Sequence, residues 1–209
     1  MKEYIAKKIN GEMTIEDARW DKVEKVRLEY TWDDFKPIPY ITEASMVHSD
    51  AGITVRMTTT EWPLRVVAMQ NEERICADSC MEFFFTPNTC DLGKYMNVEI
   101  NPAGACLFHV GGKMGEQNVR GIVPVEGSGM RIRTLITPME GWTLMFFIPY
   151  TLIDSFYDKR DKVFKANFYK CGDMTVKKHY AAWNPVLTEK PSYHQPQFFG
   201  QVILSEDAL

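Results

Sequence analysis

The sequence predicts an all-β fold: a single-domain, mostly antiparallel β-sandwich of the jelly-roll type with one short helix. Short segments in which apolar and polar side chains alternate recur along the chain, turn-forming residues separate them, and only one segment has features of a helix. Of the 209 residues, 45% are hydrophobic, which suffices for one sizeable core, so we expect one domain over residues 1–209.

The expected strands follow in chain order. Residues 25–32 and 53–57 alternate strictly between apolar and polar side chains, as in strands with one buried face. Segments 79–85 and 95–101 flank a turn-rich stretch and predict a hairpin with a long loop. Further strands are expected at 105–110, 130–137, 141–148, 163–169 and 201–204, the third of them apolar on both faces like a central strand.

Two other segments connect these strands. Residues 150–158 follow Pro149 and predict the short helix, because proline suits the start of a first turn. The glycine-rich, polar segment 111–129 predicts a mobile excursion between strands rather than a domain boundary.

Composition excludes several classes of partner and location. The net charge of −4 makes nucleic acid and anionic membranes poor partners, and no run of 18 apolar residues predicts a transmembrane helix. The amino terminus has no apolar segment behind its lysines, so we expect a cytoplasmic protein if the chain is complete and a secreted one if it is truncated. The five cysteines include no C-x-x-C pair and predict reduced, buried thiols, with one internal disulfide left open.

The segment 179–200 contains five aromatic rings among three prolines and predicts an ordered loop. Two interpretations stay open for the rings. They stack against the C–H face of a sugar, or they close one end of the sandwich. The second interpretation suits Trp183, Phe198 and Phe199 best.

The predicted hairpin brings polar side chains to one face. Strand alternation places Glu82 opposite the apolar face of its strand, and it places Asn97, Glu99 and Asn101 on the same side of the partner strand. Carboxylates and amides in fixed positions suit vicinal hydroxyls, although an ordinary solvated sheet face has the same pattern. Trp62, before Pro63 at a loop edge, either faces a ligand or covers the core.

Catalytic and cofactor motifs are absent from the sequence. There is no G-x-S-x-G motif, no P-loop and no dinucleotide fingerprint, so we predict no catalytic residue and no cofactor. The four histidines are scattered without the spacing of transition-metal ligands; they are His48, His109, His179 and His194. Three aspartates lie in loop-like stretches but form no D-x-D-x-D-G run, so structural calcium stays an open question; they are Asp78, Asp91 and Asp173. Glu82 and Glu99 allow a glycosidase hypothesis, which is disfavoured because no neighbouring group separates their pKa values.

Taken together, these segments resemble the family 9 carbohydrate-binding modules and their free-standing relatives. The resemblance spans residues 15–205. Four stretches carry it: WDKV at 20–23, DSCMEFF at 78–84, YMNVEINP at 95–102 with Gly104, and YHQP at 193–196 followed by FG at 199–200.

The resemblance implies a β-sandwich that holds a sugar between two tryptophan rings, with polar contacts from paired strands. It implies that Tyr193 occupies the position of one ring, Glu82 that of the acidic strand residue, and Asn101 that of a polar residue on the partner strand. Glu99 replaces a basic residue of the family. The second tryptophan is missing from the segment RICA at 74–77, where Trp62 is the possible substitute. Structural calcium accompanies the family, but no ligand set carries over to this chain.

We therefore expect non-catalytic carbohydrate binding through Tyr193, Glu82, Asn101, Glu99 and Asn97, with Trp62 as a second platform. The ligand would be a mono- or oligosaccharide. One alternative is a small glycoside hydrolase, or its accessory subunit, that uses Glu82 and Glu99. The other is a protein-interaction domain that has lost the sugar site.

Overall fold

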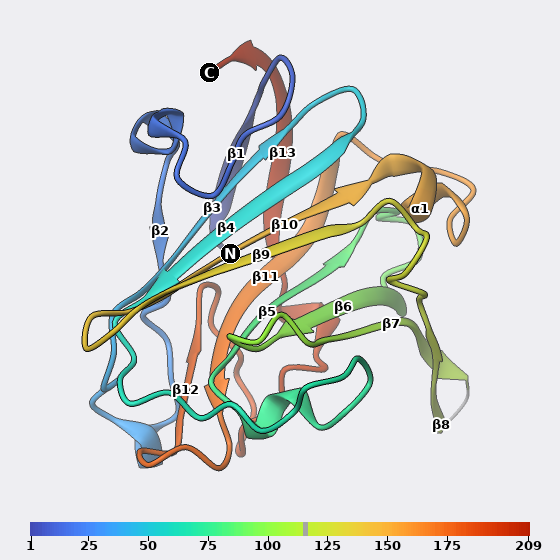
Figure 1. Ribbon diagram of the computed structural model, residues 1–209. Helices are drawn as coiled ribbons and strands as arrows, with labels where there is room; N and C mark the ends of the chain where they lie inside the picture. The colour runs from blue at the N-terminus through green and yellow to red at the C-terminus, as the bar shows by residue number, and fades with distance from the viewer. Residues whose placement is uncertain (115–116) are drawn as a thin grey trace.

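The computed structural model describes residues 1–114 and 117–209 (Figure 1). The helical elements are α1 (Tyr150–Asp154) and the 3-10 turns η1 (Ala18–Lys22), η2 (Asp33–Phe35), η3 (Ile75–Ala77) and η4 (Pro196–Phe198). The strands are β1 (Glu3–Lys8), β2 (Val26–Arg27), β3 (Thr42–His48), β4 (Gly52–Thr59), β5 (Cys80–Thr86), β6 (Lys94–Ile100), β7 (Cys106–Met114), β8 (Gln117–Ile122), β9 (Arg131–Thr137), β10 (Gly141–Pro149), β11 (Val163–Gly172), β12 (His179–Ala182) and β13 (Gly200–Ala208).

The strands form one hydrogen-bonded path in the order β8-β7-β6-β5-β11-β13-β1-β3-β4-β10-β9. This path folds over so that β3, β4, β10 and β9 lie on one side of the main core and β7, β6, β5 and β11 lie on the other (Figure 1). β1 pairs in parallel with β13 and β3, while the other pairs are antiparallel. The prediction of a mostly antiparallel β-sandwich with one short helix is confirmed.

The main core lies between the two layers. Met81, Phe83 and Phe85 of β5 point into it, as their alternation predicted. The Phe83 ring lies 5.0 Å from the Phe168 ring of the neighbouring strand and 6.3 Å from the Phe146 ring of the opposite layer. Complete burial of one such side chain contributes about 2–3 kcal/mol to stability, so this contact helps to hold the two layers together.

A second buried cluster covers the other face of β5, β6 and β11. The connecting segments on either side of η2 and η3, and the loop after β12, lie over this face. The cluster includes Trp32, Ile75, Phe84, Tyr95, Tyr169, Val186, Tyr193 and Phe199. This sheet layer is therefore buried on both faces, so the hypothesis of an ordinary solvated face is wrong.

Several boundaries differ from the predicted ones. The strand expected at 25–32 is reduced to β2, because Tyr30 and Trp32 turn toward the carboxyl-terminal loop and donate hydrogen bonds to the carbonyls of Val186 and Thr188. The helix ends at Asp154, four residues early. β1, β3, β8 and β12 had no strand prediction. Much of the expected excursion at 111–129 is the β7–β8 hairpin, although residues 115–116 lie outside the described residues.

Trp20 packs the amino-terminal segment onto the sandwich, where its indole donates to the Thr14 carbonyl. Across the described residues, the helices are all too short or too polar to reach from one side of a membrane to the other.

Candidate functional site

The polar side chains of β5 and β6 meet as the alternation predicted. Glu82 lies directly across from Glu99, and Phe84 lies across from Asn97. The Asn97 amide donates to Glu99 at 3.0 Å, and Arg120 of β8 donates to the Asn97 carbonyl oxygen. Glu82 is 3% exposed and Glu99 6%, so both side chains are almost completely buried beneath the covering segments. We call Glu82, Asn97 and Glu99 the acidic floor.

The protein environment changes the acidity of both floor carboxyls. Burial is the main cause that raises the pKa of Glu82 well above its usual range, and the neighbouring charge of Glu99 adds to it. Burial also raises the pKa of Glu99 to about 7, against the opposing effects of the Asn97 hydrogen bond and the Arg120 charge. Two adjacent carboxylates resist simultaneous ionisation, so the pair retains a proton near neutral pH.

Half-buried side chains stand around this floor. Glu72 accepts hydrogen bonds from the Phe108 amide and from His109 Nε2. The Tyr180 hydroxyl donates to Asp173 Oδ1 at 2.7 Å. The charges of Glu72 and Asp173 both act on Glu99, so both side chains lie in the neighbourhood of the floor. We call Glu72, Cys76, His109, Asp173 and Tyr180 the polar rim.

Rings pack around Tyr180 without enclosing it. The Phe35 ring meets it edge-on at 4.7 Å, and the Trp32 and Tyr193 rings meet it at 6.2 Å and 6.1 Å, respectively. The Lys178 ammonium lies 5.7 Å from the ring centroid. These contacts hold Tyr180 in one orientation, and the residue as a whole is half-buried.

Tyr193 does not provide an open ring face, and the expectation that it stacks against a sugar is wrong. Its ring is only 8% exposed and stacks on Tyr169 at a centroid distance of 4.0 Å. Its hydroxyl donates to the Lys170 carbonyl at 2.9 Å and accepts from the Ala181 amide at 3.1 Å. Tyr193 therefore ties the carboxyl-terminal loop to β11 and β12.

Asn101 is also separated from the floor. It is fully buried, and its amide donates to the Ala68 carbonyl and to Asp78 Oδ2, while its oxygen accepts from the amides of Ala103 and Ala105. Asp78 in turn accepts hydrogen bonds from Arg65 and from backbone amides, so protein donors already occupy its carboxylate. The prediction of a sugar contact by Asn101 is wrong, because these bonds use its hydrogen-bonding capacity.

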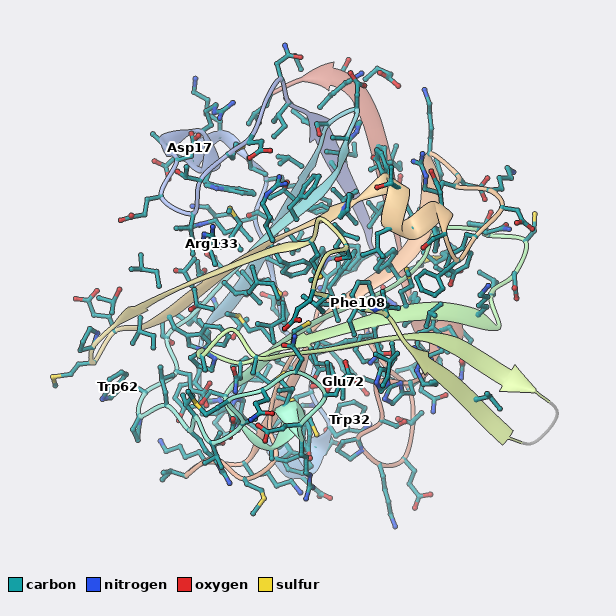
Figure 2. The ribbon with its side chains drawn as sticks, turned by 45° about the vertical axis from the view of Figure 1, so that its right-hand side comes forward. Asp17, Trp32, Trp62, Glu72, Phe108 and Arg133 are labelled. Carbon is teal, nitrogen blue, oxygen red and sulfur yellow. The ribbon has the colours of Figure 1, made fainter. Side chains whose placement is uncertain are left out.

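Trp62 is exposed, as expected at a loop edge, but it does not reach the floor. Its side chain is 37% exposed, and Figure 2 shows it well apart from Glu72. The preceding residue, Glu61, points inward instead. Of the six predicted residues, the structure thus brings together Glu82, Asn97 and Glu99, and it separates Tyr193, Asn101 and Trp62 from them.

A buried ion pair anchors the segment that carries part of the rim. Glu61 Oε2 lies 2.7 Å from Lys170 Nζ, with both side chains at most 1% exposed, and Ser79 donates to the other carboxylate oxygen at 2.8 Å. Burial and the Lys170 charge lower the pKa of His179 to about 3. The imidazole Nδ1 donates to the Lys177 carbonyl. Nothing in the alternation of β11 distinguished Lys170, since a lysine in a strand usually points to solvent.

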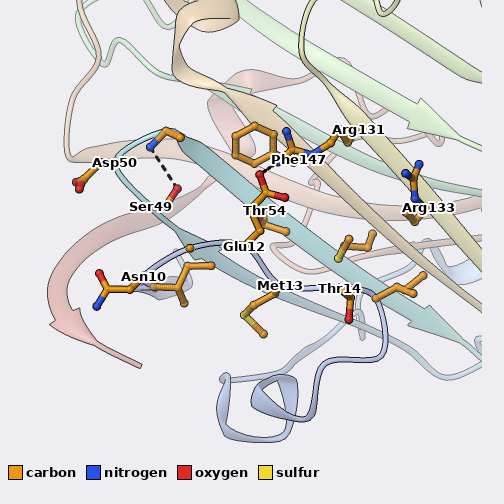
Figure 3. Close-up of a pocket in the computed structure, with 15 residues that line it drawn as sticks. Asn10, Glu12, Met13, Thr14, Ser49, Asp50, Thr54, Arg131, Arg133 and Phe147 are labelled. Carbon is orange, nitrogen blue, oxygen red and sulfur yellow. Dashed lines mark hydrogen bonds and ion pairs between the residues drawn. The ribbon is translucent and has the colours of Figure 1, made fainter.

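A separate hollow of about 540 Å³ lies between residues 9–15 and strands β4, β9 and β10 (Figure 3). Met145 and Phe147 form its apolar part, and Arg131 and Arg133 border it. The Arg131 guanidinium lies 4.1 Å from the centroid of the Phe147 ring and pairs with Glu12. The guanidinium therefore covers one face of Phe147, the aromatic residue of this lining.

Comparison with known proteins agrees with this architecture. The family model described as carbohydrate-binding family 9 matches residues 9–204. The structure of a candidate carbohydrate-binding protein from Bacteroides uniformis has a TM-score of 0.82 and 26% identity, covering 98% of this chain and 99% of the other. A search of curated proteins found no match.

Two structures of a family 9 carbohydrate-binding module from Caldicellulosiruptor kristjanssonii share the fold at lower identity. The complex with glucose has a TM-score of 0.68 at 12% identity and covers 99% of this chain and 97% of the other. The complex with cellotriose has a TM-score of 0.66 at 11% identity, with coverage of 99% and 95%, respectively.

Proposed function

The chain belongs to carbohydrate-binding family 9, and from this premise we propose that it binds a mono- or oligosaccharide, without chemical turnover, over the acidic floor. The observation that carries this location is Tyr180. It is an aromatic residue of the polar rim that is only half-buried, and its hydroxyl is fixed on Asp173 beside the floor carboxyls.

The chemistry of this site suits a sugar ring. An aromatic face attracts polarised C–H groups, and carboxylates accept hydrogen bonds from hydroxyls. Asp173 and Glu72 are ionisable acceptors at the rim, while the Arg120 guanidinium beside Asn97 is a donor. The raised pKa of Glu82 favours its protonated form, so this carboxyl can donate as well as accept. A site with both kinds of group can match a hydroxyl, which donates one hydrogen bond and accepts others.

The floor carboxyls support binding rather than hydrolysis. A glycosidase needs one protonated and one ionised carboxyl on either side of the scissile bond. Here Glu82 and Glu99 are direct cross-strand neighbours with raised pKa values, and both are almost completely buried. As cross-strand neighbours they lie side by side on one sheet face, and not on opposite sides of a bound sugar.

Calorimetry with glucose and cellotriose, alongside a glycan array, tests this proposal. Loss of the stacking ring in Tyr180→Ala removes about 1 kcal/mol or more, which weakens binding at least fivefold to tenfold. Tyr180→Phe keeps the ring and retains most of the affinity. Tyr150→Ala is a matched control, since Tyr150 is another half-buried tyrosine and follows β10 at a distance from the rim.

The outcomes separate location from function. Equal affinities for Tyr180→Ala and the unmodified protein would place the sugar elsewhere on the molecule. Binding to no glycan on the array would contradict carbohydrate binding itself. Turnover of aryl glycosides that disappears in Glu82→Gln would contradict the non-catalytic assignment.

A further inference from the structure

Two thiols and a carboxylate converge beneath the rim. Cys80 of β5 lies directly across from Cys171 of β11, and Glu82 is two residues along β5 on the same face. One ligand atom from each of the three residues lies within 4.8 Å of the others, and all three side chains are buried. In the part of the chain that the structure describes, the cysteines are free.

We propose that Cys80, Cys171 and Glu82 bind a thiophilic divalent cation, with zinc as the best match. Thiolate and carboxylate are established zinc ligands, and three protein ligands leave the fourth position of a tetrahedral ion for water or another small ligand. The site goes beyond carbohydrate binding and shares Glu82 with the acidic floor, so a bound cation would displace the proton that lets Glu82 donate to a sugar.

The distances fit this ion after small side-chain movements. The same Glu82 oxygen lies 2.8 Å from Cys171 Sγ and 3.9 Å from Cys80 Sγ. Zinc bonds of about 2.3 Å to sulfur and about 2.0 Å to oxygen separate tetrahedral sulfur and oxygen ligands by about 3.5 Å. The two observed distances lie on either side of this value. Rotations that move the ligand atoms by less than about 1 Å would therefore suffice.

The charges around the cluster favour a cation. Glu99 is the cross-strand neighbour of Glu82, and the charges of Glu99 and Asp173 act on Glu82 as well. The charge of the buried Lys170 ammonium also acts on all three ligands, and this ammonium is paired with Glu61. A divalent ion would displace protons from the thiols and the carboxyl, and its charge would stabilise the ionised ligands in this dry environment.

The covering segment provides a route of entry. The carbonyl of Cys76, in η3, lies 3.6 Å from Cys171 Sγ, and the Cys76 side chain is half-buried. Local opening of this one short turn would expose the cluster without separating β5 from β11.

The test uses the full chain, reduced and stripped of metal with a chelator, then titrated with cobalt(II) alone. We expect saturation at one equivalent, a thiolate-to-cobalt charge-transfer band, and the intense visible bands of a tetrahedral ion. Cys80→Ser and Cys171→Ser should each reduce the charge-transfer intensity by about half or more and weaken zinc binding by at least about a hundredfold, because loss of even an outer-shell partner costs about tenfold to a hundredfold. Cys106→Ser is the matched control, because Cys106 is a buried thiol of β7 outside the cluster.

A measurement on the unmodified chain keeps the proposal falsifiable if a serine variant fails to fold. X-ray absorption of the zinc-loaded protein should count two sulfur ligands. No sulfur ligand in that spectrum, no charge-transfer band at saturating cobalt, or an unchanged band in both folded serine variants would overturn the proposal.

Discussion

Replacement of Tyr193 by alanine separates a structural role for this residue from a role in ligand binding. The substitution removes a ring that stacks on Tyr169 and a hydroxyl that bonds the Lys170 carbonyl and the Ala181 amide. If Tyr193 were a surface platform, the variant would lose sugar binding and keep its stability. The buried position predicts a loss of stability first.

The magnitude follows from the contacts. Removal of a large aromatic ring from a packed interior costs about 3–5 kcal/mol, because it loses transfer free energy and leaves a cavity. The Ala181 amide also loses its acceptor, which adds about 1–3 kcal/mol if no water replaces it. We expect Tyr193→Ala to lower the free energy of unfolding by about 5 kcal/mol, and Tyr193→Phe, which retains the ring, by about 1–2 kcal/mol.

Urea denaturation followed by circular dichroism measures both effects. With a slope of about 2.5 kcal/mol per molar urea, Tyr193→Ala should lower the midpoint by about 2 M and Tyr193→Phe by less than 1 M. Phe198→Ala is a suitable control, because this ring of the same loop is only half-buried and should cost much less. A Tyr193→Ala midpoint equal to that of the unmodified protein would refute the reasoning.

Two further predictions concern the buried ion pair and its neighbour. Lys170→Met leaves the Glu61 carboxylate buried without its cation and should lower the free energy of unfolding by about 3–5 kcal/mol. Glu61→Gln combined with Lys170→Met should recover much of this loss, because no buried charge is then left unpaired. Equal urea midpoints for the single and double variants would contradict this prediction. His179 has a folded-state pKa lowered from 6.5 to about 3, so the unfolded chain binds the extra proton below pH 6.5 and stability falls as the pH falls toward 3. About 2 kcal/mol of this loss is present at pH 5, and His179→Gln should remove it; parallel pH profiles of stability for the two proteins would argue against this assignment.

Much of the sheet was predictable because strand alternation is a local property. The period of two placed Met81 and Phe83 in the core, and the hairpin prediction put Glu82 and Glu99 together on the opposite face; the structure adds the register that pairs them directly. These outcomes depend only on residues that lie near one another along the chain. For the same reason, the acidic floor was the part of the candidate site that could be predicted correctly.

The rim was not predictable, because it consists of segments joined by long-range contacts. Tyr180 and Tyr193 lie in the same aromatic segment, residues 179–200, and its composition does not show that Tyr180 belongs to β12 and Tyr193 to the loop that follows. Tyr193 is buried because its hydroxyl finds partners on the backbones of β11 and β12. Tyr180 is only half-buried at the edge of the second buried cluster, where its hydroxyl donates to Asp173.

By itself, the sequence determined the β-sandwich class, the pairing of the central hairpin and the acidic character of one sheet face, since each follows from residue periodicity and turn composition. Only the tertiary structure decided that the connecting segments bury this face. The Glu61–Lys170 pair and the Asp78–Asn101 hydrogen bond hold those segments in place, and each joins residues distant in the chain. A buried polar group must find its partner wherever the fold supplies one, and that choice leaves no periodic pattern in the sequence.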